Sequence, residues 1–96
     1  MDYINKVEMS GIITDVRKTD GGTVFAMIKQ EAMFNDGTIH DRLYELLINA
    51  SRKDVIEQMV SGSYVLVTGQ LTIFKVKKFN TYKMIIDVQN VKTLQE

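Results

Sequence analysis

Aromatic and basic side chains are concentrated in one short segment, TIFKVKKFNTYK, at residues 72–83. The segment holds three aromatic residues and four lysines without a single Asp or Glu. Aromatic rings offer flat surfaces on which nucleobases stack, at about 1–3 kcal/mol per base, and lysine ammonium groups attract phosphates. The segment therefore predicts a surface that binds a single-stranded nucleic acid.

The charge distribution supports this interpretation, although the net charge of the chain is zero. No Asp or Glu lies between Gln58 and Ile86, so no acidic neighbour in the sequence offsets the lysines of that stretch. A local charge of this kind acts over a Debye length of about 8 Å at physiological salt, whatever the total charge. The alternative is that the lysines only solubilise an exposed hairpin.

Catalytic and metal-binding residues are sparse. The chain has no cysteine and one histidine, His40, whereas a zinc site needs several ligands close together. Asp36 and Asp41 lie in a turn-rich segment, where carboxylates more often form turns than acid–base pairs. The sequence thus predicts a binding protein rather than an enzyme, with no metal, no cofactor and no small-molecule substrate.

The elements that must position the aromatic and basic residues are mostly strands. Alternating apolar and polar residues predict three of them in the first half of the chain, at residues 6–16, 23–31 and 40–50. Turn-forming residues at 19–22 and 34–38 separate these strands. Gly11, midway along the first strand, predicts a bulge or a sharp bend there.

After the third predicted strand, the spacing of the apolar residues changes from that of a strand to that of a helix. Residues 51–62 place apolar side chains at helical spacing, with Ser51 as the expected N-cap and Asp54 near the positive end of the helix dipole. We therefore predict a helix of about ten residues. Residues 63–74 and 82–94 return to the alternation of strands.

Three strands, a helix and two strands are the element order of an OB-fold. Five short strands that close into a barrel leave no long exposed edge, and the helix can cover one end of the barrel. We predict an all-β protein, a five-stranded OB-fold barrel with one short α-helix between strands 3 and 4, and a single domain over residues 1–96. No apolar run approaches the ~18 residues of a membrane span, so we expect a cytoplasmic protein without a membrane partner.

Several motifs resemble those of the bacterial and phage single-stranded-DNA-binding proteins. These are NKVEMSG near the start, the pair Gly21 and Gly22, YELLIN before the helix, and above all GSYVLVTGQL at residues 62–71. The resemblance covers about residues 4–94. It implies an OB-fold that binds single-stranded DNA without sequence specificity, commonly as a homo-oligomer (dimer or tetramer), in DNA replication, recombination or repair. The chain has no tryptophan, so any stacking rests on Phe and Tyr alone. It also has no acidic C-terminal tail, which favours a phage, plasmid or mobile-element protein, or a truncated form.

The candidate binding residues come from two sources. The resemblance implies outward side chains in the strand before the helix, Arg42 and Tyr44, and others where the fourth strand enters its hairpin, Thr72, Phe74 and Val76. The aromatic and basic side chains themselves add Phe25, Lys29, Lys75, Lys77, Lys78, Phe79, Tyr82 and Lys83.

Some alternatives stay open at this point. Phe74 could equally be a core residue, because an apolar run alone does not tell which alternate residues of a strand face inward. Phe25 and Met27 could belong to a subunit contact or a core wall. The whole protein could be an interaction or assembly module, or could bind single-stranded RNA, since backbone charge and stacking serve both nucleic acids.

Overall fold

The computed structural model describes residues 2–95. Its five strands are β1 (Val7–Lys18), β2 (Val24–Met33), β3 (Ile39–Ile48), β4 (Tyr64–Val76) and β5 (Thr81–Thr93). One α-helix, α1 (Lys53–Glu57), lies between β3 and β4, and a 3₁₀ turn, η1 (Lys77–Phe79), joins β4 to β5.

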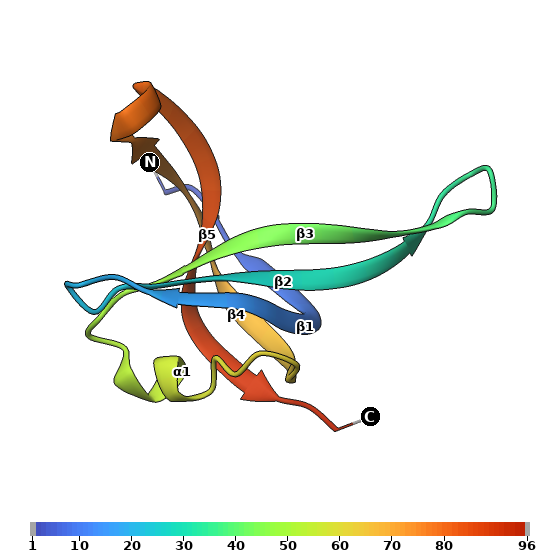
Figure 1. Cartoon of the computed structure of the whole chain (residues 1–96), viewed down its shortest axis with the longest axis horizontal. Helices are drawn as coiled ribbons and strands as arrows, with labels where there is room; N and C mark the ends of the chain where they lie inside the picture. The colour runs from blue at the N-terminus through green and yellow to red at the C-terminus, as the bar shows by residue number, and fades with distance from the viewer. Residues whose placement is uncertain (1, 96) are drawn as a thin grey trace.

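The strands form a closed barrel in the order β1-β2-β3-β5-β4. All neighbours pair antiparallel except β3 and β5, which pair in parallel over two residue pairs and close the barrel. Figure 1 shows the barrel with α1 below it. The predicted OB-fold is therefore confirmed, with its element order and its short helix between the third and fourth strands.

The core consists of the inward-facing residues of all five strands, because successive side chains of a strand point to opposite sides. Fully or almost fully buried are Ile13, Val24, Ala26, Ile28, Leu46, Ile48, Val65, Val67, Ile86, Val88 and Val91, together with Val55 and Met59 from the helical region. Each buried aliphatic side chain stabilises the fold by roughly 1.5–3 kcal/mol relative to an exposed one. This core makes the barrel a fixed frame for the outward side chains.

The helix is shorter than predicted. It begins at Lys53 and has five residues, with Arg52 rather than Ser51 at the N-cap position. The predicted N-cap is wrong because the Ser51 amide and hydroxyl both donate to Asn49 Oδ1, each at 2.9 Å, in the preceding turn. Met59, beyond the helix, is buried in the core, so tertiary packing rather than helix propensity sets the path of this segment.

Gly11 does not mark a bulge. The irregularity in the pairing of β1 with β2 lies between Thr14 and Arg17, where Asp15 has a positive φ of 51°. A Cβ at Gly11 would lie 2.5 Å from the Lys29 carbonyl oxygen, so glycine is required because the backbones of β1 and β2 approach closely.

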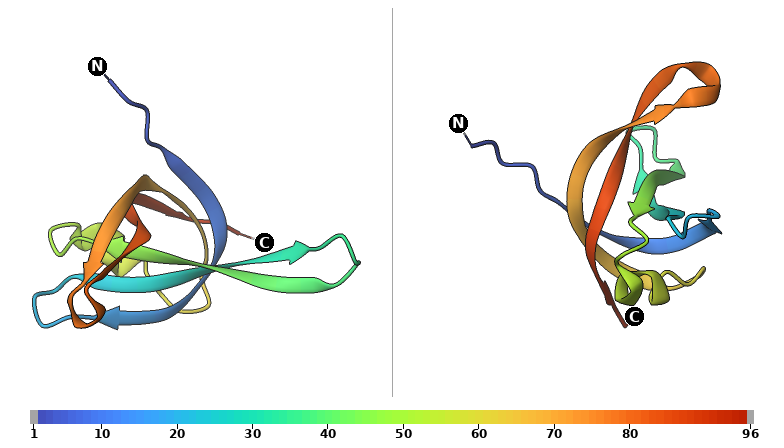
Figure 2. Two further views of the ribbon diagram at one scale, coloured as in Figure 1. Left: turned by 90° about the horizontal axis from the view of Figure 1, so that it is seen from above. Right: turned by 90° about the vertical axis from the view of Figure 1, so that its left-hand side faces the viewer.

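Two hairpins extend beyond the barrel. Cross-strand pairing continues to Met33 and Ile39 in one of them and to Val76 and Thr81 in the other. We call residues 29–43 the β2–β3 arm and residues 71–86 the β4–β5 arm; the second range begins at the barrel wall, where Leu71 pairs with Ile86 and Ile86 still faces the core. Figures 1 and 2 show that the two arms project from the barrel in different directions.

The N-terminal segment is attached to the start of the β4–β5 arm. The Asn5 side-chain amide donates to the Leu71 carbonyl oxygen at 2.8 Å, and its Oδ1 accepts from the Leu71 amide at 3.0 Å. One side chain therefore satisfies both backbone groups of Leu71, just beyond the last pairing of β1 with β4. Within residues 2–95, no helical segment has the length and apolar character needed to span a bilayer.

Candidate nucleic-acid interface

An open hollow of about 330 Å³ lies on the outer surface of the barrel, where β1, β2 and β3 meet the β4–β5 arm. We call it the barrel groove. The residues that line it are Arg17, Lys18, Thr19, Phe25, Glu45, Phe74 and Lys83. They come from all five strands and the turn after β1, and only the closed barrel brings them together.

Two aromatic rings form the apolar part of the barrel groove. Phe25 and Phe74 contact each other edge to face, with ring centroids 5.5 Å apart and an interplanar angle of 76°. Phe25 faces outward because its neighbours Val24 and Ala26 face the core. Both phenylalanines are half-buried, so each keeps ring surface that a flat ligand can cover. Phe74 does not belong to the core cluster.

Lys83 is held in place by an ion pair and a ring. Its Nζ lies 2.7 Å from both carboxylate oxygens of Glu45 and 5.8 Å from the centroid of Phe74, its cross-strand neighbour. The sequence around Lys83 contains no acid that could offset its charge, but Glu45 approaches it from β3. Lys83 therefore orients Phe74 and adds little net positive charge to the barrel groove.

The net positive charge of the barrel groove comes from Arg17 and Lys18 at the end of β1. Neither residue was among the candidates from the sequence. The sequence does contain a feature that could have identified them, because two adjacent basic residues directly precede the turn at residues 19–22. Glu45 was also missed, since its contact with Lys83 spans 38 residues of the chain.

The β4–β5 arm presents two faces with different neighbours. Thr72, Phe74 and Val76 lie on one face, as the sequence predicts. Phe74 connects this face to the barrel groove, because it lines the groove and contacts Phe25. Lys75 pairs across the strands with Tyr82 on the other face, where the Lys75 Nζ lies 6.0 Å from the Tyr82 ring centroid. The structure therefore does not bring Lys75 and Tyr82 to the barrel groove.

The tip of the β4–β5 arm carries exposed basic and aromatic side chains. It consists of η1 and Asn80, which has a left-handed φ of 47° that closes the turn. Lys77, Lys78 and Phe79 are all exposed there, and the Lys78 Nζ lies 5.6 Å from the Phe79 ring centroid.

Tyr44 does not face outward, so the predicted orientation is wrong. It pairs across the strands with the buried Ile28 and packs against the core. The physical reason is its parity, because Tyr44 lies on the same side of β3 as the buried Leu46 and Ile48. Arg42 shares this parity but lies beyond the barrel end on the β2–β3 arm, where it is exposed.

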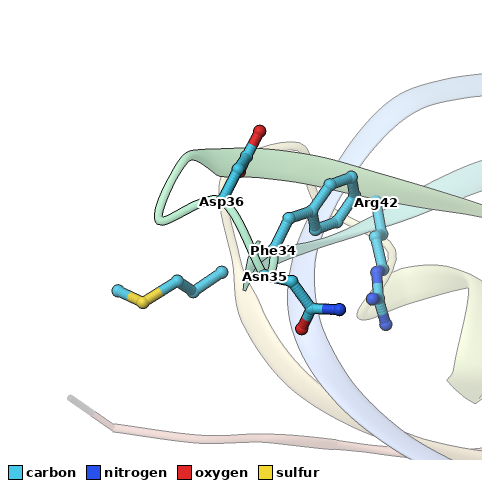
Figure 3. Close-up of a pocket in the computed structure, with 5 residues that line it drawn as sticks. Phe34, Asn35, Asp36 and Arg42 are labelled. Carbon is cyan, nitrogen blue, oxygen red and sulfur yellow. The ribbon is translucent and has the colours of Figure 1, made fainter.

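Arg42 belongs to a second aromatic and basic cluster, formed with Phe34 and His40 at the tip of the β2–β3 arm. Its guanidinium carbon lies 5.6 Å from the Phe34 ring centroid, and the Phe34 and His40 rings are 4.6 Å apart. These residues adjoin an open pocket of about 540 Å³ that Phe34 and Arg42 line. In Figure 3 the Phe34 ring and the Arg42 side chain lie side by side, and the Asp36 carboxylate points away from them.

Asp36 stabilises the turn rather than the cluster. Its carboxylate accepts hydrogen bonds from the Thr38 amide at 2.9 Å and the Thr38 hydroxyl at 2.6 Å. These bonds favour the charged form and lower the pKa of Asp36 below its ordinary value. Within residues 2–95, no group of three or more His, Cys, Asp or Glu side chains is arranged to hold a metal ion.

An acidic pair lies beyond the barrel groove on the outer face of β2 and β3. Phe25, Met27 and Lys29 share this face of β2, and Lys29 is half-buried. Glu31 follows on the same face and lies directly opposite Asp41 of β3. These two carboxylates repel phosphates, so they limit the extent of an anion-binding surface in this direction.

Comparisons with known proteins bear on the fold. No protein-family model matches the sequence, and no curated protein matches it by sequence. Among solved structures, the chain is similar to a small single-stranded DNA binding protein from Mycoplasma pneumoniae, with a TM-score of 0.75 and 17% identity over 94% of this chain and 93% of that one. It is also similar to the dimeric N-terminal domain of the PriB protein from Thermoanaerobacter tencongensis, with a TM-score of 0.61 and 15% identity over 96% and 98% of the two chains. At these identities the likeness establishes the fold.

Proposed function

We propose that this protein binds single-stranded DNA in the barrel groove, without sequence specificity and without catalysis. The observation that carries the proposal is the Phe25–Phe74 ring pair, which lies half-exposed in an open hollow beside Arg17 and Lys18. Stacking surfaces next to cations are the two ingredients of sequence-independent binding to single strands, because every base has a flat face and every nucleotide a phosphate.

The proposed path of the strand follows the charges. Bases stack on Phe25 and Phe74, and phosphates lie near Arg17 and Lys18. From there the strand runs toward the exposed tip of the β4–β5 arm, past the face that carries Thr72 and Val76. The candidate residues at this tip are Lys77, Lys78 and Phe79. In the other direction the path ends near Lys29, because the acidic pair Glu31 and Asp41 follows it on the same face.

Arg42 remains a candidate, but at a separate place from the one that the sequence predicts. It lies at the tip of the β2–β3 arm beside Phe34, where a ring and a guanidinium group offer a second stacking point. Tyr44 has no direct role in this proposal because it packs against the core. Lys75 and Tyr82 have none either, because they lie on the face of the β4–β5 arm that is turned away from the barrel groove.

The similar fold of a protein that is named a single-stranded DNA binding protein supports the proposal. Our proposal also includes the more specific expectations from the sequence. These are a role in DNA replication, recombination or repair, a phage or mobile-element type of protein, a homo-oligomer and a cytoplasmic location. RNA in place of DNA is the competing ligand, since stacking and phosphate contacts serve both.

The experiment is a fluorescence titration with dye-labelled oligo-dT, short enough for one copy of the protein, beside a duplex and a single-stranded RNA of equal length. We expect Phe74→Ala to weaken oligo-dT binding by roughly 5- to 150-fold, the equivalent of one lost stacking contact. Tyr82→Ala is the matched control, because it removes an exposed ring from the opposite face of the same arm and should leave the affinity unchanged.

Three outcomes would contradict the proposal. Equal affinity for the duplex would mean that no stacking on free bases takes place. Tighter binding of the RNA oligonucleotide would assign the barrel groove to RNA instead. Equal losses for Phe74→Ala and Tyr82→Ala would move the site away from the barrel groove.

A further inference from the structure

Two exposed surfaces of the molecule have no role in the proposed DNA contact. The first lies on the outer face of the β2–β3 arm, and we call it the acidic face. Its exposed residues are Glu31, Met33, Ile39, Asp41 and Leu43, which share one side of the two strands by register. Lys29 lies on the same side, opposite Leu43 and one step from the acidic pair, but it is half-buried and makes no ion pair with either carboxylate. Met33, Ile39 and Leu43 are each more than half exposed, which is unusual for three large apolar side chains on one face.

The acidic face carries an electrostatic cost in the isolated chain. Glu31 and Asp41 are direct cross-strand partners, and like charges in such positions repel each other. Neither carboxylate has a salt-bridge partner among residues 2–95, where the one ion pair joins Lys83 to Glu45. A cation from another molecule placed between them would relieve this repulsion.

The second surface lies on the β4–β5 arm, on the face turned away from the barrel groove, and we call it the basic face. Its residues are Leu71, Ile73, Lys75, Tyr82 and Met84. Ile73, Tyr82 and Met84 are each almost two-thirds exposed or more. The ammonium group of Lys75 lies against the Tyr82 ring, and no carboxylate occurs between residues 58 and 86.

The two faces match in pattern and in charge. On the β2–β3 arm, the acidic pair lies next to the apolar pair Met33 and Ile39, one step of two residues along the strands. On the β4–β5 arm, the pair of Lys75 with Tyr82 lies one such step from the apolar pair of Ile73 with Met84. When the β2–β3 arm of one molecule lies against the β4–β5 arm of another, Lys75 can therefore lie between the two carboxylates. In the same arrangement, the apolar pair of one arm can pack against the apolar pair of the other.

The two faces of one chain cannot meet each other, because the arms project from the barrel in different directions (Figures 1 and 2). We propose that the acidic face of one copy of this chain binds the basic face of a second copy. Such a contact joins two different surfaces, so every bound copy leaves one acidic and one basic face open for the next. The result is a head-to-tail row of copies that forms without DNA.

The contact should be weak and sensitive to salt. Each face offers only a handful of exposed side chains, far fewer than the roughly 20–30 residues per side of a standard stable interface. Opposite charges on exposed arms contribute less as salt is raised, because screening shortens their range. Association should therefore increase with protein concentration and decrease with ionic strength.

The experiment is sedimentation velocity of the full chain without nucleic acid, over a wide range of protein concentrations and at two salt concentrations. We expect the average sedimentation coefficient of the natural chain to rise steadily with concentration, past the value of a dimer. An acidic-face variant, Glu31→Lys with Asp41→Lys, should lower the association constant at least about tenfold, because it places cations against Lys75. A basic-face variant, Ile73→Lys with Met84→Lys, should do the same by removing the apolar pair.

Mixing the two variants gives the decisive measurement. The acidic-face variant keeps an intact basic face, and the basic-face variant keeps an intact acidic face. One contact can therefore form, while the other would bring lysines against lysines. We expect a one-to-one heterodimer and nothing larger. Unchanged melting temperatures of both variants serve as the control for folding, because all four replaced side chains are exposed.

Other outcomes would overturn the inference. A natural chain that stays monomeric at every concentration would mean that the faces bind something else or nothing. A closed dimer or tetramer that neither variant disturbs would locate self-association on another surface. Loss of association in the basic-face variant alone would mean that the basic face pairs with itself. None of these results depends on DNA binding, so they leave the proposed function to its own test.

Discussion

At the scale of single residues, the barrel groove depends on side chains that hold one another. Phe74 contacts Phe25, and Lys83 lies over Phe74 while Glu45 holds its ammonium group. A ring fixed in this way loses little side-chain entropy when a base stacks on it. The effects of substitutions at Phe25 and Phe74 should therefore not be additive, because the two rings share one contact.

Glu45→Gln tests the assignment of Lys83. Removing the carboxylate charge leaves the Lys83 ammonium group free to contact a phosphate, so we expect tighter binding of oligo-dT. The slope of log K against log salt concentration should become steeper by about 0.7. Titrations at three or more salt concentrations measure this slope. A slope that does not change would mean that Lys83 stays outside the path of the phosphates even when it is free.

Tyr44→Ala tests the corrected position of that residue. Because the ring packs against the core beside Ile28, we expect the substitution to lower the free energy of unfolding by about 2 kcal/mol. Denaturant unfolding followed by circular dichroism measures this change. The affinity of the folded protein for oligo-dT should stay the same, and a large loss of affinity without a loss of stability would return Tyr44 to the binding surface.

At the scale of elements, the sequence predicted what lies inside the barrel better than what lies on the arms. Val24, Ala26 and Ile28 alternate with outward residues, and all three are buried as the pattern indicates. On the β4–β5 arm the same kind of alternation misleads, because Leu71 and Ile73 are apolar and yet exposed. An alternation pattern does not tell where a hairpin leaves the barrel.

The tip of the β4–β5 arm supplies a prediction for that element. Replacing Lys77 and Lys78 together by Gln should weaken binding to all base sequences alike and lower the salt slope by about 1.4, since each would be a phosphate contact. Lys92→Gln is the control, because this exposed lysine lies toward the opposite end of β5. Equal effects of the tip variant and the control would indicate a nonspecific response to net charge.

At the scale of the whole molecule, barrel closure decides which residues form the site. Arg17, Phe25, Glu45 and Phe74 lie on four different strands, and no local pattern relates them. The closed barrel could be predicted because five short strands otherwise leave long exposed edges. The pairing of Lys83 with Glu45 could not, because it depends on the register between the β4–β5 arm and β3.

Gly11→Ala tests the close approach of β1 and β2 within the barrel. The added Cβ would lie 2.5 Å from the Lys29 carbonyl oxygen, so β1 and β2 would have to move apart, at a cost of about 1–3 kcal/mol in the free energy of unfolding. Thermal unfolding measures this cost. Gly21→Ala is the matched control, because its Cβ would meet only the Thr19 hydroxyl oxygen, at 4.0 Å. Similar melting temperatures for both variants would show that the barrel tolerates the wider spacing.

The Asn5 amide has a consequence for how copies of this protein can meet. Its two hydrogen bonds use up the donor and the acceptor that Leu71 would otherwise offer to an incoming chain. An unpaired strand border invites a neighbour to continue the sheet, and such growth leads to aggregates. The Asn5 side chain therefore prevents another strand from pairing with the backbone at this position. Contacts between molecules must then be made by side chains, whose strength depends on salt and on single substitutions.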